Sequence, residues 1–320
     1  MMKKTLFVCF TALLGLGLLS MTPTLAEENN PKDLILKKLT WQDRERTYWL
    51  HLPPEDKMTG ALPVLFHLHG GGGTGKGTPG LTYRRFNKIA DREGFIVVYP
   101  DAIAKNWNDG RTENLKPENR DVDDVGFIVE IINQLKSEYS IDATKIFSTG
   151  MSNGGFMTSR LLCDRSDLFR GGAILTASIS EAYLPKCDPA TPVAVLVMNG
   201  TDDPLVPYEG GDIRLFKRGK SRGKIISNDD YLEFWQQKNA CTGIESDVVL
   251  PDKKRRDGTT VHVRTYSNCV SGGALKFYKI VGGGHTWPGG KQYLGKRIIG
   301  NTSREINACD EIWEFFSSLD

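Results

Sequence analysis

The sequence lacks an excess of charge of either sign, an internal repeat and a linker rich in proline, serine or threonine. Its 320 residues carry 41 Lys and Arg against 39 Asp and Glu, which gives a formal net charge of +2. This balance gives no reason to expect a nucleic acid or another polyanion as a partner. The basic run at 253–256 adjoins Asp257-Gly258, a hairpin-turn dipeptide, and predicts a solvated turn.

The chain also lacks an apolar run long enough to span a bilayer. The apolar stretch at about 6–19 follows Lys3 and Lys4 and precedes Thr24 and Ala26. Positive, apolar and small residues in this order are typical of a secretory signal peptide, here with cleavage near Ala26. We therefore expect a signal peptide at 1–26 and one domain at 27–320, exported to the periplasm or the medium and free of the membrane after cleavage.

Cysteine is scarce, with six residues in the whole chain. Export would permit disulfide bonds, although the sequence alone does not fix their pairing. Proximity along the chain favours Cys163 with Cys187 and Cys241 with Cys269. Cys309 would then remain as a free thiol, or simply as a small buried residue, in the last helix.

Short, nearly continuous apolar runs recur along the mature chain. Runs of this kind suit strands that are buried on both faces of a parallel sheet. Helical patterns lie between or after them, at 123–140, 153–163, 228–239 and 304–319. This alternation predicts an α/β fold with a mostly parallel central sheet and helices on both faces. The predicted strands lie at 33–41, 46–53, 62–69, 94–100, 145–150, 171–178, 193–200 and 275–282.

A G-x-S-x-G motif, Gly150-Met151-Ser152-Asn153-Gly154, stands between a predicted strand and a predicted helix. In that context the motif marks a sharp turn that exposes a nucleophilic serine, and the glycines leave room for it. A chance match in a glycine-rich chain is the alternative. The surrounding strand, turn and helix favour Ser152 as a nucleophile.

A nucleophilic serine needs a base, and in this topology the acid and then the histidine follow the serine. Asp202 and Asp203 come directly after the strand at 193–200, and His285 follows the strand at 275–282. Because α/β active sites gather at the carboxyl ends of strands, His285 is the expected base and one of the two aspartates the expected acid.

The stretch "FHLHGGGGTGKGT" at 66–78 allows two interpretations, a phosphate-binding loop or an oxyanion hole. A Walker loop needs Ser or Thr after its lysine, and Lys76 is followed by Gly77. An H-G-G-G turn supplies an oxyanion-hole N–H in esterases. We therefore expect the N–H groups of Gly71 and Asn153 to bind the oxyanion.

Seven motifs stand in the order seen in one enzyme family. They are "LHGGGG", "GFIVVYPDAI", "WND", "DVDDVGFI", "GMSNGGFMTSRL", "NGTDDPLVPYEGG" and "GGGHTWPGG". With them the chain resembles the polyhydroxybutyrate depolymerase / feruloyl esterase family of secreted serine esterases, which have the α/β-hydrolase fold.

The resemblance implies Ser152 as nucleophile, His285 as base, and Asp203 rather than Asp202 as acid, since the family's acid directly precedes a proline. It also implies a bridge between Cys241 and Cys269. Relatives often carry a cysteine where this chain has Gly71.

Two tryptophans are candidates for substrate binding. Trp287 and Trp107 could stack on a phenolic or sugar group, and packing beneath the site is the alternative for each.

These observations predict a monomeric hydrolase of carboxylic esters that forms an acyl-enzyme and needs no metal or cofactor. Its substrate would be a feruloyl or acetyl ester of a plant polysaccharide, or alternatively a hydroxyalkanoate oligomer. A non-catalytic binding protein on the same scaffold is the alternative of another class, and a nucleotide-binding protein is the weakest one.

Overall fold

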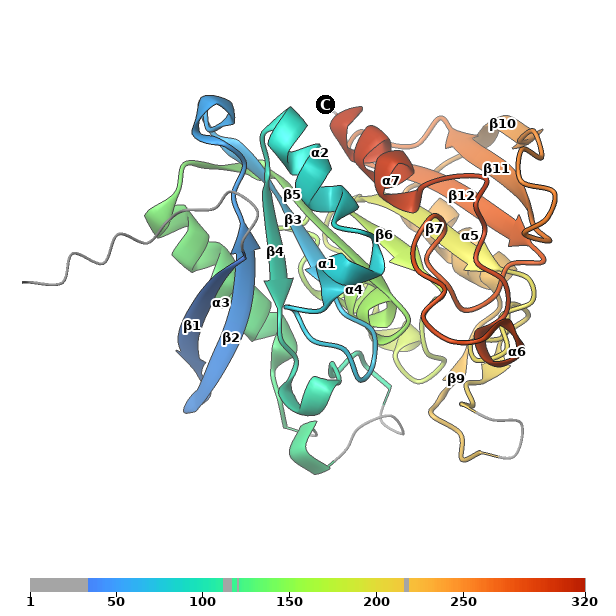
Figure 1. Ribbon diagram of the computed structural model, residues 1–320, viewed down its shortest axis with the longest axis horizontal. Coiled ribbons are helices and arrows are strands. Elements are labelled where there is room, and N and C mark those ends of the chain that lie inside the picture. The colour runs from blue at the N-terminus through green and yellow to red at the C-terminus, as the bar shows by residue number, and fades with distance from the viewer. Residues whose placement is uncertain (1–33, 112–116, 120, 216–218, 320) are drawn as a thin grey trace, which may run out of the picture. The chain divides into compact units, whose positions relative to one another are not determined.

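The apolar runs form one ten-stranded sheet in the computed structural model, which describes residues 34–111, 117–119, 121–215 and 219–319 (Figure 1). The predicted signal peptide at 1–26 lies outside the described residues. The strands are β1 (Ile35–Trp41), β2 (Arg44–His51), β3 (Leu62–Leu68), β4 (Ile96–Pro100), β5 (Ile141–Met151), β6 (Gly171–Leu175), β7 (Ala194–Gly200), β10 (Gly243–Val249), β11 (Thr260–Ser267) and β12 (Ala274–Val281).

The strand order is β1-β2-β4-β3-β5-β6-β7-β12-β11-β10. The six strands from β4 to β12 in this order are parallel, whereas β1, β2, β11 and β10 pair in antiparallel fashion at the two sides. A separate two-stranded ribbon joins β8 (Gly211–Asp212) to β9 (Lys224–Ile225). The predicted, mostly parallel sheet is therefore confirmed.

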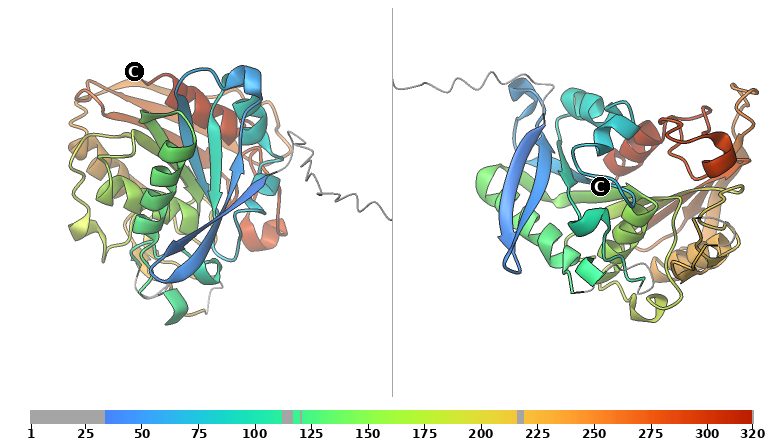
Figure 2. Two further views of the ribbon diagram at one scale, coloured as in Figure 1. Left: turned by 90° about the vertical axis from the view of Figure 1, so that its left-hand side faces the viewer. Right: turned by 60° about the horizontal axis from the view of Figure 1, so that its bottom comes forward.

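Helices cover both faces of the sheet, as Figures 1 and 2 show. One face packs against α3, α4 and α5, and the other against α2 and α7. Successive strand residues alternate between the two cores, with Phe66 in the first and Leu65 in the second. The helices are α1 (Thr78–Leu81), α2 (Arg85–Glu93), α3 (Asp124–Glu138), α4 (Asn153–Asp164), α5 (Asn228–Lys238), α6 (Lys296–Ile299) and α7 (Ala308–Ser317).

Two disulfide bonds tie loops to this framework. Cys163 at the end of α4 bonds to Cys187, and Cys241 after α5 bonds to Cys269 after β11. Cys309 is free and fully buried in α7, where burial raises the pKa of its thiol. Both predicted pairings and the predicted free thiol are confirmed.

Among the described residues, no helix has the length and apolar character that crossing a membrane requires.

Candidate active site

Ser152 occupies a strained turn between β5 and α4. Its backbone angles are φ 57° and ψ −125°, a region that residues with a side chain rarely adopt. The Ser152 N–H donates to the Leu175 carbonyl at 2.9 Å and to Thr176 Oγ1 at 3.2 Å, which fixes the turn against the neighbouring strand β6. The predicted strand, turn and helix around the G-x-S-x-G motif are present.

The two glycines of the motif allow the turn to pass close to other backbone. A Cβ atom at Gly150 would lie 2.4 Å from the carbonyl carbon of Gly154. A Cβ atom at Gly154 would lie 2.4 Å from the Leu68 carbonyl oxygen at the end of β3. Neither contact can be relieved by rotating a flexible side chain, so both positions require glycine.

Asp203 and His285 lie together at the carboxyl ends of β7 and β12. Asp203 Oδ2 is 2.7 Å from His285 Nδ1, and both side chains are almost completely buried. Asp203 Oδ1 accepts hydrogen bonds from the Leu205 N–H at 2.8 Å and the Val206 N–H at 2.9 Å. These bonds hold the carboxylate in place, so the imidazole is oriented with Nε2 on the opposite side of the ring from the acid.

The neighbouring Asp202 has a different environment. It is exposed, and its carboxylate accepts a hydrogen bond from Thr201 Oγ1 at 2.9 Å. Its backbone N–H donates to the Gly283 carbonyl at 2.9 Å, which links the aspartate loop to the histidine loop. Of the two candidate acids, Asp203 is therefore the one that contacts His285.

The loop that carries His285 is held on both sides of the histidine. The His285 N–H donates to the Ile299 carbonyl at 2.6 Å, and the Tyr293 hydroxyl donates to the His285 carbonyl at 2.9 Å. The Gly284 N–H donates to the Asn301 carbonyl at 2.9 Å. The strands β5, β6, β7 and β12 are parallel neighbours. Ser152, Asp203 and His285 each come just after one of these strands, so all three lie at the carboxyl-terminal end of the sheet.

The glycine-rich loop after β3 lies against the serine turn. A Cβ atom at Gly70 would lie 3.8 Å from Ser152 Cβ, and one at Gly71 would lie 3.7 Å from Asn153 Cβ. Within the described part of the chain, nothing accepts a hydrogen bond from the Gly71 N–H. Asn153 is the first residue of α4, where backbone N–H groups have no partner inside the helix. The two predicted oxyanion donors are thus adjacent.

Hydrogen bonds of His69 stabilise the glycine-rich loop. The Lys76 side chain is directed toward Trp49 and not into the loop, where a phosphate ligand would lie. The His69 Nδ1 donates to the Gly70 carbonyl at 2.8 Å, and its Nε2 accepts from the Ala102 N–H at 3.1 Å. Burial lowers the pKa of His69, which favours this neutral form. The Lys76 ammonium instead lies 5.0 Å from the centre of the Trp49 ring.

The predicted contact of Trp107 and Trp287 with a substrate requires correction, because both side chains are fully buried. The Trp107 indole donates to the His69 carbonyl at 2.9 Å, so this ring supports the glycine loop from below. The centre of the Trp287 ring lies 4.9 Å from the centre of the His67 ring, in the core between the sheet and helices α2 and α7. The burial of both rings therefore supports the alternative interpretation, in which Trp107 and Trp287 pack beneath the site.

A buried polar cluster that the sequence did not reveal supports Asn153. The Asn153 side chain accepts from the Trp107 N–H at 2.7 Å and donates to Asp109 Oδ2 at 2.6 Å. Asp109 in turn forms a buried ion pair with Arg111, whose guanidinium lies 4.1 Å from the centre of the Phe156 ring. The only local signal was the proximity of an acid and an arginine two residues apart, which is too common to interpret.

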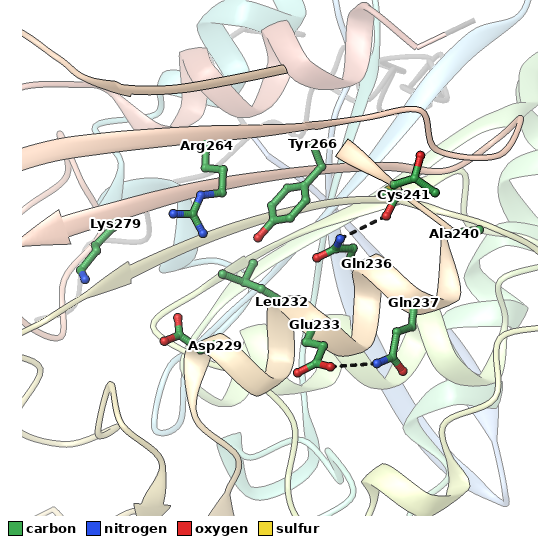
Figure 3. Close-up of a pocket in the computed structure, with 11 residues that line it drawn as sticks. Asp229, Leu232, Glu233, Gln236, Gln237, Ala240, Cys241, Arg264, Tyr266 and Lys279 are labelled. Carbon is green, nitrogen blue, oxygen red and sulfur yellow. Dashed lines mark hydrogen bonds between the residues drawn. The ribbon is translucent and has the colours of Figure 1, made fainter. Parts of the chain in front are cut away.

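A cavity of about 340 Å³ lies beside the glycine loop. Its lining includes Met151, the residue before Ser152, together with Gly70, Gly72 and Lys105. A larger polar groove of about 740 Å³ lies between α5 and β11, where Figure 3 shows Glu233, Gln236, Arg264 and other polar side chains. No residue of the candidate triad lines that groove.

This chain is similar to several known proteins and solved structures. Residues 84–183, a stretch that contains Ser152, match the model of the prolyl oligopeptidase family. The esterase candidate NocK of Nocardia uniformis subsp. tsuyamanensis is 26% identical over 85% of this chain and 79% of its own length. Feruloyl esterase B of Piromyces equi is 29% identical over 64% of this chain, and "Probable feruloyl esterase C" of Aspergillus niger is 28% identical over 52%.

The chain spans only 36% of that feruloyl esterase B and 58% of that feruloyl esterase C. Among solved structures, an acetyl xylan esterase from Aspergillus awamori aligns with a TM-score of 0.58 over 88% of this chain and 99% of its own, at 15% identity. A thermostable esterase aligns with a TM-score of 0.56 over 89% of this chain and 62% of its own, at 17% identity.

The fold is that of the α/β-hydrolases, as the sheet, the serine turn and the solved structures agree. The resemblance to feruloyl esterases is confirmed, and the relatives likewise confirm the prediction of a carboxylic ester hydrolase.

Proposed function

We propose that this protein is a secreted serine esterase that cleaves feruloyl or acetyl esters of plant polysaccharides through an acyl-enzyme. The observation that carries the proposal is the 2.7 Å contact between Asp203 Oδ2 and His285 Nδ1. This contact lies at the carboxyl-terminal end of the parallel strands, the same end at which Ser152 follows its strand. A binding protein on this scaffold would have no need for a buried carboxylate and imidazole held in this way.

In the proposed mechanism His285 Nε2 removes the proton from Ser152 Oγ as that oxygen attacks the ester carbonyl. Asp203 holds the imidazole in the required tautomer and stabilises its positive charge. The carbonyl oxygen becomes an oxyanion and accepts hydrogen bonds from the N–H groups of Gly71 and Asn153. Each such donor contributes roughly 2.7–4 kcal/mol of transition-state stabilisation.

The intermediate then collapses, and His285 passes its proton to the departing alcohol. A water molecule enters, His285 takes a proton from it, and the hydroxide attacks the acyl carbonyl. As the bond to Ser152 Oγ breaks, His285 returns the proton to that oxygen, which releases the acid and restores Ser152. The strained backbone of Ser152 supports this role, because rare backbone conformations persist mainly where function requires them.

Two features support the substrate class and the site of action. The relatives named feruloyl esterase act on esters of ferulic acid by name, and the present chain resembles them over 52–64% of its length. The two disulfide bonds fit a protein that folds in an oxidising compartment, in agreement with the predicted signal peptide. In this proposal the mature protein acts as a monomer and has no nucleic-acid partner.

The test compares wild-type protein with Ser152→Ala on methyl ferulate, acetylated xylan and hydroxybutyrate oligomers. We expect the wild type to release ferulate or acetate, and the variant to lose this activity while it keeps its circular dichroism spectrum. A fluorophosphonate probe should label the wild type only. Equal rates for the two proteins would refute the role of Ser152, and hydrolysis of the hydroxybutyrate oligomers alone would refute the proposed substrate class.

A further inference from the structure

A strongly basic pocket of about 640 Å³ lies next to the loop that carries His285. The turn between β10 and β11, helix α6 and the segment before α7 contribute its walls. Six cations and two carboxylates line it, so its formal charge is +4 although the whole chain carries only +2. The cations are Lys253, Lys254, Arg255, Arg256, Lys296 and Arg304.

The nearby carboxylates of Glu305 and Asp257 bond to backbone amides and form no ion pair with these described cationic side chains. The Glu305 carboxylate accepts from the Lys253 N–H and the Lys254 N–H, each at 2.6 Å. Asp257 accepts from the Thr259 N–H at 2.7 Å and from the Arg304 N–H at 2.6 Å. None of the six cationic side chains forms an ion pair with a carboxylate in the described part of the chain.

The pocket shares a loop with the proposed catalytic base. Gln292 lines the pocket and accepts from the Thr302 N–H at 3.1 Å and the Thr302 hydroxyl at 2.8 Å. The next residue, Tyr293, donates its hydroxyl to the His285 carbonyl at 2.9 Å. A polymer chain held in the basic pocket would therefore lie against the segment that positions His285.

We propose that this basic pocket binds the carboxylate groups of an acidic polysaccharide, such as one that contains uronic acid units, and so favours esters carried on acidic chains. This inference rests on the proposed function. Arginine and lysine bind carboxylates through charge-assisted hydrogen bonds, and the planar guanidinium can make two such bonds at once. Exposed cations hold a single carboxylate weakly, so a polymer with repeated charges gains most from the cluster.

The lining favours a polysaccharide over a nucleic acid. Proteins that bind single-stranded nucleic acid combine positive charge with aromatic side chains on which the bases stack. None of the described residues that line this pocket is aromatic. The turn at 253–256 was predicted to be merely solvated, and its proximity to α6 and Arg304 is what makes it part of a site.

The test measures binding without turnover, by calorimetry on Ser152→Ala protein. The probes are an oligogalacturonate, a neutral xylo-oligosaccharide of equal length and a single-stranded DNA of equal charge. We expect the oligogalacturonate to bind, its affinity to fall about tenfold or more between about 50 and about 200 mM salt, and the neutral oligomer not to bind. The double variant Arg255→Glu/Arg256→Glu should weaken binding about tenfold or more, because it reverses two charges of the pocket.

The matched control is Lys88→Glu/Lys136→Glu, which makes the same change of charge on exposed residues of α2 and α3 and should keep the affinity. Absence of oligogalacturonate binding, equal binding of the neutral oligomer, or tighter binding of the DNA would each overturn the proposal. Since the oligogalacturonate carries no ester, this result is independent of hydrolysis, which the Ser152→Ala comparison on esters tests separately.

Discussion

His67 makes the free energy of unfolding of this protein depend on pH. The residue is fully buried in β3, 5.1 Å from the Phe86 ring and 4.9 Å from the Trp287 ring. Its Nδ1 has no hydrogen-bond partner among the described residues. Burial, with a smaller contribution from His69, lowers the pKa of His67 from 6.5 to about 3.

The sign of the effect follows from which state binds the proton. Below pH 6.5 the unfolded chain protonates at this residue while the folded protein does not, so the free energy of unfolding falls as the pH drops from 6.5 toward 3. At pH 4.5 the two pKa values give a loss of about 3 kcal/mol relative to neutral pH. For a protein of this size that corresponds to about 5 °C in Tm.

The assay is thermal unfolding at pH 7.0 and pH 4.5 for the wild type and for His67→Phe, which cannot titrate and suits an aromatic environment. The variant should lose about 5 °C less than the wild type over this interval. Phe86→Leu is the control, because it disturbs the same contacts without removing a titrating group and should shift both Tm values equally. The reasoning is refuted if His67→Phe and the wild type lose the same amount.

Three further predictions address the active site and the framework. Gly154→Ala should lower kcat/KM on a p-nitrophenyl ester about 100-fold or more, because its Cβ would lie 2.4 Å from the Leu68 carbonyl oxygen. Gly295→Ala, where nothing lies within 4 Å of the added atom, should leave the rate unchanged, and an equal loss in both variants would contradict the argument. Asp203→Asn should lower kcat by about 10⁴-fold by favouring the wrong imidazole tautomer, whereas Asp202→Asn should retain activity; the reverse ranking would assign the acid to Asp202. Cys163→Ser/Cys187→Ser should lower the free energy of unfolding by roughly 3 kcal/mol in urea titrations, since the bond closes a loop with a sequence separation of 24, and an unchanged midpoint would show that the bond contributes no stability.

The sequence determined the parallel part of the sheet and the serine turn, because both depend on local patterns, whereas the outer strands β10 and β11 were not predicted. Continuous apolar runs such as 62–69 and 193–200 are typical of strands that are buried on both faces. In the structure these two runs form β3 and β7. The motif around Ser152 fixed a turn between a strand and a helix, because only glycine permits the backbone contacts at positions 150 and 154.

Only the tertiary structure decided which of several residues of the same type takes part in the site, because this depends on contacts with distant segments. The family resemblance implied Asp203 because a proline follows it, but the residue types alone left Asp202 and Asp203 open, and the contact depends on which carboxylate meets a histidine more than 80 residues later. Trp107 and Trp287 look alike as aromatic residues beside a site, and only packing shows that both are buried. In the same way, four basic residues in a turn become part of a pocket only because Lys296 and Arg304 fold against them. Contacts of this kind depend on the position of the partner, which a local pattern in the sequence does not specify.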